Sequence, residues 1–211
     1  MLRTEDPQLA RFHDLDPRWA SSGRGRVFRS PTLFEDVVKT VTSCNVTWKG
    51  TINMNRRLCA VINPAFPRPG QLARKRPATL RARCGVGYRD VRLVELGRVF
   101  RDPEVTIALE DMSRTDDAVH RELLALPGVG PYAAANIMQL LGRYSRLAVD
   151  TELIGHGRGT LGMKGNDRAV AKAMETHYAP FDDQKFRSYW FEKWVHYESK
   201  HGPAWTWEPH E

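Results

Sequence analysis

The sequence predicts an all-α fold with two helical lobes that meet at a cleft. Apolar residues recur at helical spacing through most of the 211 residues. No segment shows the alternation that a half-buried strand needs. Clusters of proline and glycine, such as residues 64–70, separate the helical stretches from one another.

The N-terminal part begins with an arm and a short helix over residues 1–30. A strong helix follows, because Thr32 is a candidate N-cap and Glu35 lies three residues later, as in a capping box. A polar break at residues 42–45 ends this helix. A second helix is expected over residues 48–61.

The rest of the chain predicts further helices separated by turns. Pro77 interrupts a helical stretch over residues 71–84. The C-terminal helix is rich in aromatic residues, whose spacing is mostly that of a core, although one or two of them can line a pocket for a base. The remaining helices are expected at residues 91–101, 117–126, 133–142, 166–178 and 182–201.

The charge balance favours a polyanionic partner. The chain has 32 Lys and Arg residues against 25 Asp and Glu residues, a formal net charge of +7, and a pI near 9.5. Many basic proteins bind no nucleic acid, so charge alone leaves both possibilities open.

The cysteine pattern and the hydropathy exclude several classes of protein. Cys44, Cys59 and Cys84 are odd in number and far apart, so we expect no disulfide framework and no four-cysteine iron–sulfur cluster. No signal-like or membrane-length apolar run is present, which predicts a cytoplasmic protein with no membrane partner.

The sequence Leu-Pro-Gly-Val-Gly at residues 126–130 predicts a sharp turn between two helices. Its glycines permit positive φ and close backbone approach. Such a turn before a helix directs backbone N–H groups outward, where a phosphate oxygen can accept them. A carboxylate follows at Asp150, and a phosphate clamp with a carboxylate at fixed separation indicates chemistry on a nucleic acid.

These residues resemble the helix-hairpin-helix DNA glycosylase superfamily. Residues 126–136 look like its hairpin, and Ala-Val-Asp-Thr at 148–151 looks like its catalytic aspartate segment. Tyr132 precedes Asp150 by 18 residues, the spacing that the family uses between a variable catalytic position and its aspartate.

The resemblance extends upstream of the hairpin. Residues 42–59 and residues 80–89 are similar to a helix pair and a Gly-Tyr-Arg loop of 8-oxoguanine DNA glycosylases. The similarity covers the chain from about Pro31 onward. It implies one glycosylase domain over residues 31–211, with the hairpin at about residues 121–142 and a DNA-binding cleft between the lobes.

The chain departs from the family pattern in ways that matter for chemistry. Bifunctional members carry a lysine at the position of Tyr132, and a lysine can form a Schiff base with the sugar. Tyrosine cannot, so hydrolysis by water that leaves an abasic site is expected; its ring is a candidate to stack on an extruded base or to pack in the core. No cysteine follows Cys84, so no iron–sulfur cluster is implied, and the residues before Pro31 are too few for the β-rich domain of some members.

Asp150 is the first catalytic candidate. Breaking a glycosidic bond develops oxocarbenium charge on the sugar, which a carboxylate can stabilise while it positions or deprotonates water. The alternative is that Asp150 only caps the following helix. One side chain can do both.

The resemblance assigns two roles to the backbone of the hairpin. Gly128, Val129 and Gly130 are expected to contact a DNA phosphate. The carbonyl groups of Leu124, Leu126 and Val129 are expected to hold a K⁺ or Na⁺ ion that bridges to DNA, and no other cofactor is required. The alternative is an ordinary turn between helices.

A third group of candidate site residues consists of Asn45, Tyr88 and Arg89. An enzyme that extrudes a base must fill the gap and hold the orphaned partner base. The resemblance implies that Asn45 and Tyr88 fill the gap, and Arg89 has donors that suit a base edge. The alternative is a helix cap for Asn45 and plain surface positions for the others.

The leading hypothesis is a monofunctional DNA glycosylase of base excision repair that removes an alkylated, deaminated or mispaired base. One alternative is a bifunctional glycosylase/lyase for oxidised purines that uses a displaced lysine, such as Lys49, Lys164 or Lys172. Another is a non-catalytic binder of damaged DNA. The expected partner is double-stranded DNA bound by a monomer, nucleoid-associated in a bacterium and nuclear or organellar in a eukaryote.

Overall fold

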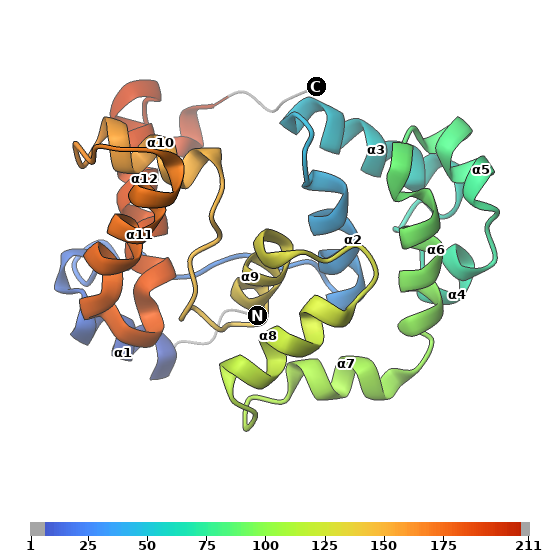
Figure 1. Cartoon of the computed structure of the whole chain (residues 1–211), viewed down its shortest axis with the longest axis horizontal. Coiled ribbons are helices and arrows are strands. Elements are labelled where there is room, and N and C mark those ends of the chain that lie inside the picture. The colour runs from blue at the N-terminus through green and yellow to red at the C-terminus, as the bar shows by residue number, and fades with distance from the viewer. Residues whose placement is uncertain (1–6, 208–211) are drawn as a thin grey trace. The chain divides into compact units, whose positions relative to one another are not determined.

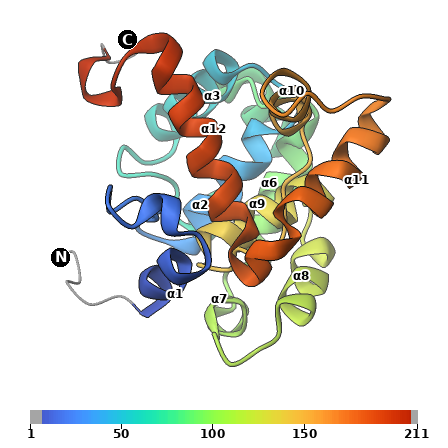
Figure 2. The ribbon, with the colours of Figure 1, turned by 90° about the vertical axis from the view of Figure 1, so that its left-hand side faces the viewer.

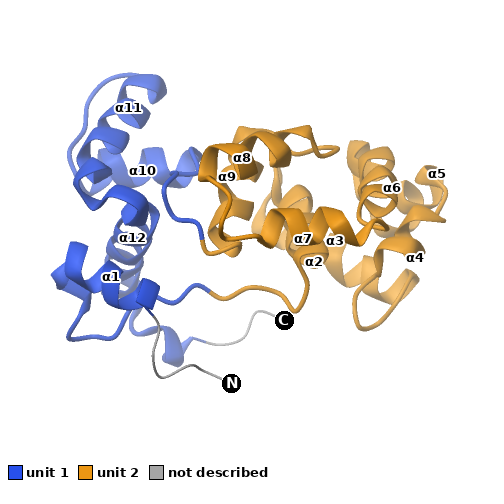
Figure 3. Cartoon of the chain, turned by 90° about the horizontal axis from the view of Figure 1, so that it is seen from below, with its two compact units in different colours: residues 1–27, 143–211 blue, residues 28–142 orange. Residues whose placement is uncertain are grey.

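The computed structural model describes residues 7–207 and divides into two compact units. Unit 1 combines residues 1–27 with residues 143–211, and unit 2 spans residues 28–142 (Figure 3). Every regular element of the described residues is helical, which confirms the all-α prediction (Figure 1). None of the described helices is long and apolar enough to cross a membrane.

Unit 2 consists of helices joined by short turns. Thr32 begins the first of them as predicted, because its hydroxyl accepts a hydrogen bond from the backbone N–H of Glu35 at 3.3 Å. Its elements are α2 (Leu33–Ser43), α3 (Trp48–Val61), α4 (Pro69–Ala73), α5 (Pro77–Thr79), the π-helical turn η2 (Leu80–Cys84), the 3₁₀ turn η3 (Gly87–Arg89), α6 (Asp90–Val99), α7 (Pro103–Glu110), α8 (Asp116–Ala125) and α9 (Pro131–Leu140).

Helices α4 and α6 pack with their backbones in contact. A Cβ atom at Gly97 would lie 2.7 Å from the backbone nitrogen of Ala73 and 2.9 Å from the carbonyl oxygen of Pro69. Only glycine allows helices to approach this closely. Fully buried Leu72, Leu93 and the other apolar side chains of the unit 2 core support the contact.

Unit 1 is built around its C-terminal helix. Figure 2 shows α12 (Lys185–His201) with α1 on one side and α10 and α11 on the other. Buried Phe12 packs on Phe191, and Tyr178 packs on Tyr189. The other elements are α1 (Pro7–Leu15), η1 (Pro17–Trp19), α10 (Thr151–Gly159), α11 (Asp167–Tyr178), η4 (Ala179–Gln184) and η5 (Ala204–Thr206).

Two helices, α7 and α10, were not among the predicted elements. Both begin with a start signal that is present in the sequence. Asp102 accepts a hydrogen bond from the N–H of Glu104 just before Pro103, and Asp150 accepts one from Leu153. Both helices are short, and α10 carries three glycines, so their intrinsic helix propensity is low.

The N-terminal residues of the predicted arm are part of the packing of unit 1. Phe12 is fully buried, and Trp19 donates its indole N–H to the buried carboxylate of Asp16 at 2.8 Å. Arg18 bonds Asp16 and reaches Glu192 on α12 at 2.5 Å. Residues 7–27 therefore complete unit 1 together with residues 143–207.

Glu192 is the centre of a polar network in unit 1. Its Oε1 atom accepts the hydroxyl of Tyr178 at 2.8 Å and lies 3.0 Å from Nε2 of buried His156. Burial raises the pKa of Glu192, but hydrogen bonds from His156, Arg18 and Tyr178 outweigh it and lower the pKa to about 2. His156 thus has a structural role.

Glu192→Gln is expected to lower the free energy of unfolding at neutral pH by about 2–3 kcal/mol. Because the folded pKa of about 2 lies below the usual 4.5, this stabilisation is complete above pH 4.5 and is lost as the pH falls toward 2. Urea unfolding at a series of pH values should show the two proteins converging in that window. Glu175→Gln, which removes a partly exposed pair with Lys185, is the control and should change stability by less than about 1 kcal/mol. An equal loss in both variants would contradict the prediction.

Candidate functional site

The predicted hairpin is present in unit 2 between α8 and α9. The N–H of Val129 donates to the carbonyl oxygen of Leu126 at 3.1 Å, and Gly128 has a φ of 81°. Proline at the second position and a left-handed glycine at the third are typical of a type II turn. Pro131 is the first residue of α9, where its missing N–H costs nothing.

The side chains of Leu126 and Val129 anchor the hairpin turn in the core, and part of its backbone is exposed. Leu126 and Val129 are each 7% exposed, whereas Gly130 is exposed. The carbonyl oxygen of Leu126 already accepts the turn hydrogen bond. Carbonyl oxygens at the end of α8 carry the negative end of the helix dipole, and such hard oxygen ligands suit a monovalent cation.

Asn45 and Tyr88 come from separate loops and meet on the surface of unit 2. Asn45 follows the C-cap of α2 with a φ of 51°, a conformation that asparagine tolerates better than most residues. Tyr88 is 52% exposed. The Nδ2 atom of Asn45 lies 3.5 Å from the hydroxyl of Tyr88, a long hydrogen bond that water or a ligand can replace.

Arg89 differs from its expected role at a base edge. The side chain is 5% exposed, and its guanidinium donates to the backbone carbonyl groups of Val41, Val86 and Cys44. The bonds to Val41 and Cys44 satisfy carbonyl groups at the C-terminal end of α2. In this structure Arg89 therefore holds the Asn45 loop in place and presents no guanidinium at the surface.

Arg92 was not among the residues predicted to contact DNA. Its guanidinium carbon lies 5.4 Å from the centre of the Tyr88 ring. Its side chain covers the hairpin so closely that a Cβ at Gly128 would be 2.9 Å from its Cδ atom. Arg92 is exposed and connects the Tyr88 loop with the hairpin. Arg92 follows Tyr88 by four residues at the start of a predicted helix, and this spacing indicates that the two side chains can meet.

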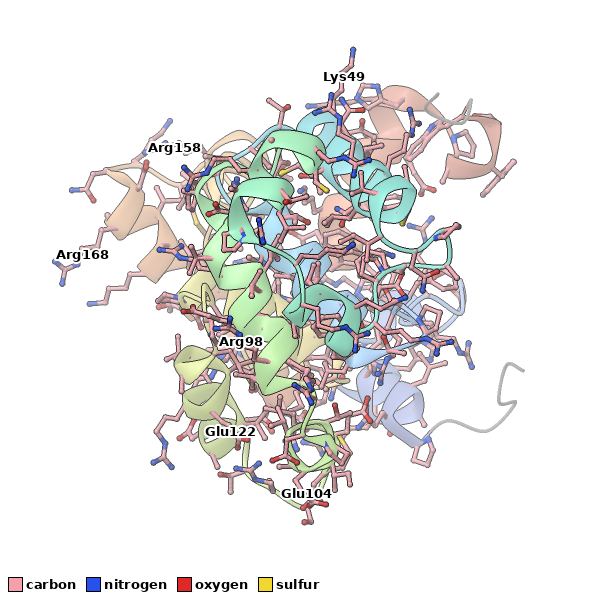
Figure 4. The ribbon with its side chains drawn as sticks, turned by 90° about the vertical axis from the view of Figure 1, so that its right-hand side faces the viewer. Lys49, Arg98, Glu104, Glu122, Arg158 and Arg168 are labelled. Carbon is pink, nitrogen blue, oxygen red and sulfur yellow. The ribbon has the colours of Figure 1, made fainter. Side chains whose placement is uncertain are left out.

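The first turn of α3, which follows the Asn45 loop along the chain, carries an exposed aromatic ring. Trp48, three residues after Asn45, is 67% exposed. Lys49 beside it projects away from the helix (Figure 4). An indole in this position has no core to pack into and is suited to stack on a base.

Asp150 lies in unit 1 as the N-cap of α10. Its Oδ1 atom accepts the N–H of Leu153 at 2.8 Å, so the capping role is confirmed. Within the described part of the chain, Oδ2 makes no hydrogen bond. One carboxylate oxygen holds the helix, and the other remains available for chemistry.

Tyr132 is the second residue of α9 in unit 2 and is half-buried. Its carbonyl oxygen accepts a hydrogen bond from the side chain of Asn136 at 3.2 Å. The tyrosine is thus held in the first turn of the helix that follows the hairpin.

A small aromatic pocket of about 130 Å³ lies in unit 1 between α12 and the first turn of α10. Trp194 is nearly parallel to Trp190 and Tyr197, with ring centroids 6.1 and 6.3 Å away. Glu152, two residues after Asp150, closes the pocket through an ion pair with Lys193 at 2.8 Å. The pocket suits a flat, apolar-faced ligand.

Comparison with known proteins identifies the fold. No protein-family model and no curated protein matches the chain. The solved structures that match include a DNA-3-methyladenine glycosidase from Bacillus halodurans (TM-score 0.69, 19% identity, 94% of each chain covered). The fold is that of the helix-hairpin-helix DNA glycosylases.

Two further solved structures are similar to the chain. A 3-methyladenine DNA glycosylase from Schizosaccharomyces pombe has a TM-score of 0.67 at 17% identity, with 96% of this chain and 100% of that chain covered. The 8-oxoguanine glycosylase/lyase of Clostridium acetobutylicum has a TM-score of 0.66 at 19% identity. That match covers 89% of this chain but 66% of the other, so the chain spans just under two thirds of its length.

In this glycosylase fold, unit 2 brings together most of the predicted DNA-contacting residues. Gly128 contacts Arg92, Arg92 lies on Tyr88, and Tyr88 reaches Asn45. Unit 1 separately contributes Asp150 and the aromatic pocket. Among the residues that the structure describes, no group of three or more His, Cys, Asp or Glu side chains is placed to hold a metal ion.

Proposed function

We propose that the protein is a monofunctional DNA glycosylase that hydrolyses the N-glycosidic bond of a damaged or mispaired base in double-stranded DNA. The observation that carries the proposal is Asp150. It caps α10 with one carboxylate oxygen and keeps the other unbonded in the described structure, within a fold shared with DNA glycosylases. One of the similar C. acetobutylicum structures holds double-stranded DNA, which supports this partner.

The chemistry follows from a fixed negative charge beside a sugar. As the bond between sugar and base lengthens, positive charge develops on C1′ and the ring oxygen. The Asp150 carboxylate stabilises this charge and accepts a proton from the attacking water. The departing base takes the bonding electron pair, and water forms the new bond to C1′, which leaves an abasic site.

Tyr132 limits the reaction to base removal. A phenol cannot form the imine that a lysine forms at this position of bifunctional glycosylases, so β-elimination of the strand has no starting intermediate there. The hairpin backbone at Gly128 and Gly130 positions a phosphate. The carbonyl groups of Leu124, Leu126 and Val129 would hold a K⁺ or Na⁺ ion, which would add positive charge beside that phosphate. The enzyme acts as a monomer.

An alkylated base is the substrate class that the aromatic pocket favours. Methylation of a purine ring nitrogen leaves the base electron-poor and often cationic. The face of Trp194 attracts positive charge through its ring quadrupole, whereas the Lys193 ammonium already lies 5.8 Å from the centre of the Trp190 ring. Deaminated bases share the flat shape but lack this charge, so they are expected to be weaker substrates.

A panel of duplexes, each with one lesion, tests the proposal. The panel includes alkylated, deaminated, mispaired and oxidised bases under single-turnover conditions. Strand breaks are expected only after alkali treatment and first with the alkylated base. Breaks without alkali would contradict the monofunctional assignment. Tight binding with no base release from any duplex would show a non-catalytic binder.

A second candidate function is a glycosylase/lyase that uses Lys193. This lysine lines the aromatic pocket beside Glu152, although it is not among the lysines that the sequence suggests. Borohydride trapping of wild-type protein, Lys193→Gln and Lys172→Gln separates the two functions. No covalent adduct is expected with any of them. An adduct with wild type and Lys172→Gln but not with Lys193→Gln would establish the lyase.

A further inference from the structure

The net positive charge of the chain arises from one segment. Residues 68–101 contain ten of the 32 basic residues and two of the 25 acidic ones, a net charge of +8. The rest of the chain then has 22 basic and 23 acidic residues, a net charge of −1. A surface that faces only solvent gains nothing from separating basic residues from acidic ones. A surface that binds a polyanion does.

The fold brings the helices of this segment together in unit 2. Helices α4, α5 and α6 lie side by side in Figures 1 and 3. The backbone contact at Gly97 fixes α4 on α6. Most apolar side chains of these helices are buried in the core, whereas most of the charged ones are exposed. The exposed residues of this arginine surface are Arg68, Arg74, Arg76, Arg81, Arg83, Arg92, Arg98 and Arg101.

The acidic residues of the segment neutralise little of the charge of the arginine surface. Asp90 is 2% exposed and pairs with Arg81 at 3.0 Å, so it neutralises one residue. The other acidic residue of the segment is half-buried Glu95. In the described structure Arg74, Arg76 and Arg98 make no side-chain ion pair or hydrogen bond. They therefore keep their charge for an outside partner.

Arg92 makes the arginine surface continuous with the hairpin. It belongs to α6, covers Gly128 and lies on the ring of Tyr88. A duplex that contacts the hairpin and the Tyr88 loop therefore also contacts α6. The ten residues of α6 extend about 15 Å, and about 15 Å of duplex carries roughly nine phosphate charges.

We infer that the arginine surface of α4, α5, η2 and α6 binds the phosphate backbone of duplex DNA outside the lesion site. The inference rests on the proposed function in one respect, since it takes duplex DNA as the partner. The surface contributes affinity without sequence or lesion preference, because backbone contacts do not distinguish bases. Its role is to hold the protein on undamaged DNA while lesions are sought.

Salt-dependent binding to an undamaged duplex of about 30 base pairs tests the inference by fluorescence anisotropy. The variant Arg74→Gln/Arg76→Gln/Arg98→Gln removes three charges from the surface and keeps the side-chain stems. The matched control Lys164→Gln/Arg168→Gln/Lys172→Gln removes three exposed charges from unit 1. Figure 4 labels one residue of each set, Arg98 on α6 and Arg168 on α11. Thermal unfolding of both variants checks that each remains folded.

The slope of log K against log salt is expected to fall in magnitude by about two to three in the arginine variant, since each lost phosphate contact removes about 0.9. The affinity should fall at least about tenfold at moderate salt, with the control close to wild type. Equal slopes in the two variants would overturn the inference. Tighter binding of duplex RNA, lost in the arginine variant, would also overturn it, because the partner would be RNA.

The measurement separates this inference from the proposed function because undamaged DNA undergoes no base release. A selective loss of slope in a protein that excises no base would support the surface and refute the glycosylase. Base excision with identical slopes in both variants would support the glycosylase and refute the surface.

Discussion

Asp150→Asn is expected to lower the single-turnover rate of base release by at least about 10³-fold while DNA binding stays close to wild type. The substitution removes the negative charge that stabilises the oxocarbenium ion, and it removes the base that accepts a proton from water. Neither role contributes to the ground-state complex with undamaged DNA. The effect should therefore appear in the rate and not in the affinity.

Asparagine is the informative replacement because it preserves the helix start. The Oδ1 atom of Asp150 accepts the N–H of Leu153 at 2.8 Å, and the amide oxygen of asparagine caps equally well. The free energy of unfolding is expected to change by less than about 0.5 kcal/mol. Asp150→Ala would lose about 1 kcal/mol as well as activity, which confuses the two roles.

Alkali-dependent strand cleavage under single-turnover conditions measures this effect. Asp167→Asn is the matched control, because Asp167 is an exposed carboxylate in the first turn of α11. Its rate should equal that of the wild type. Full activity of Asp150→Asn would refute the proposed mechanism.

Trp194→Leu is expected to lower the rate of release of a cationic methylated purine by about 10- to 100-fold, because stacking on an aromatic ring contributes about 1–3 kcal/mol per base. Trp194 occupies the middle of the aromatic pocket between Trp190 and Tyr197. Leucine keeps an apolar side chain but removes the ring quadrupole. A neutral deaminated base should therefore lose less than the cationic one.

Paired lesions make this test specific for charge. The same duplex carrying either the methylated or the deaminated base is compared in wild type, Trp194→Leu and Trp205→Leu. Trp205 is 82% exposed outside the pocket and serves as the control. Equal losses for the two bases in Trp194→Leu would contradict a cationic substrate. A loss in Trp205→Leu of the same size would contradict the assignment of the pocket.

Local signals in the sequence were sufficient for most of the fold. Thr32 caps its helix through a bond from the residue three positions later, and Pro131 opens α9. The glycine at position 128 adopts positive φ in the predicted turn. All of these depend on neighbours within four residues, so the sequence displays them directly. The short helices α7 and α10 were missed because their start signals are followed by weak propensity.

The candidate site could be predicted only in part. Asp150, the hairpin and the pair of Asn45 with Tyr88 follow from motif and spacing. Arg89 does not, because its partners at Val41 and Cys44 lie 48 and 45 residues earlier in the chain. The sequence motif predicts an exposed arginine, because the carbonyl groups that bury it are distant in the chain. In the structure, the exposed arginine beside this loop is Arg92 and not Arg89.

The sequence by itself determined the helical class, the hairpin and the tyrosine in place of a lysine. Only the tertiary structure decided which arginines are buried, which aromatic rings of α12 form a pocket, and that the basic residues 68–101 share one surface. The reason is physical. Helix caps and turns are local bonds, whereas burial and charge clustering depend on residues that are distant in the chain and meet only when helices pack.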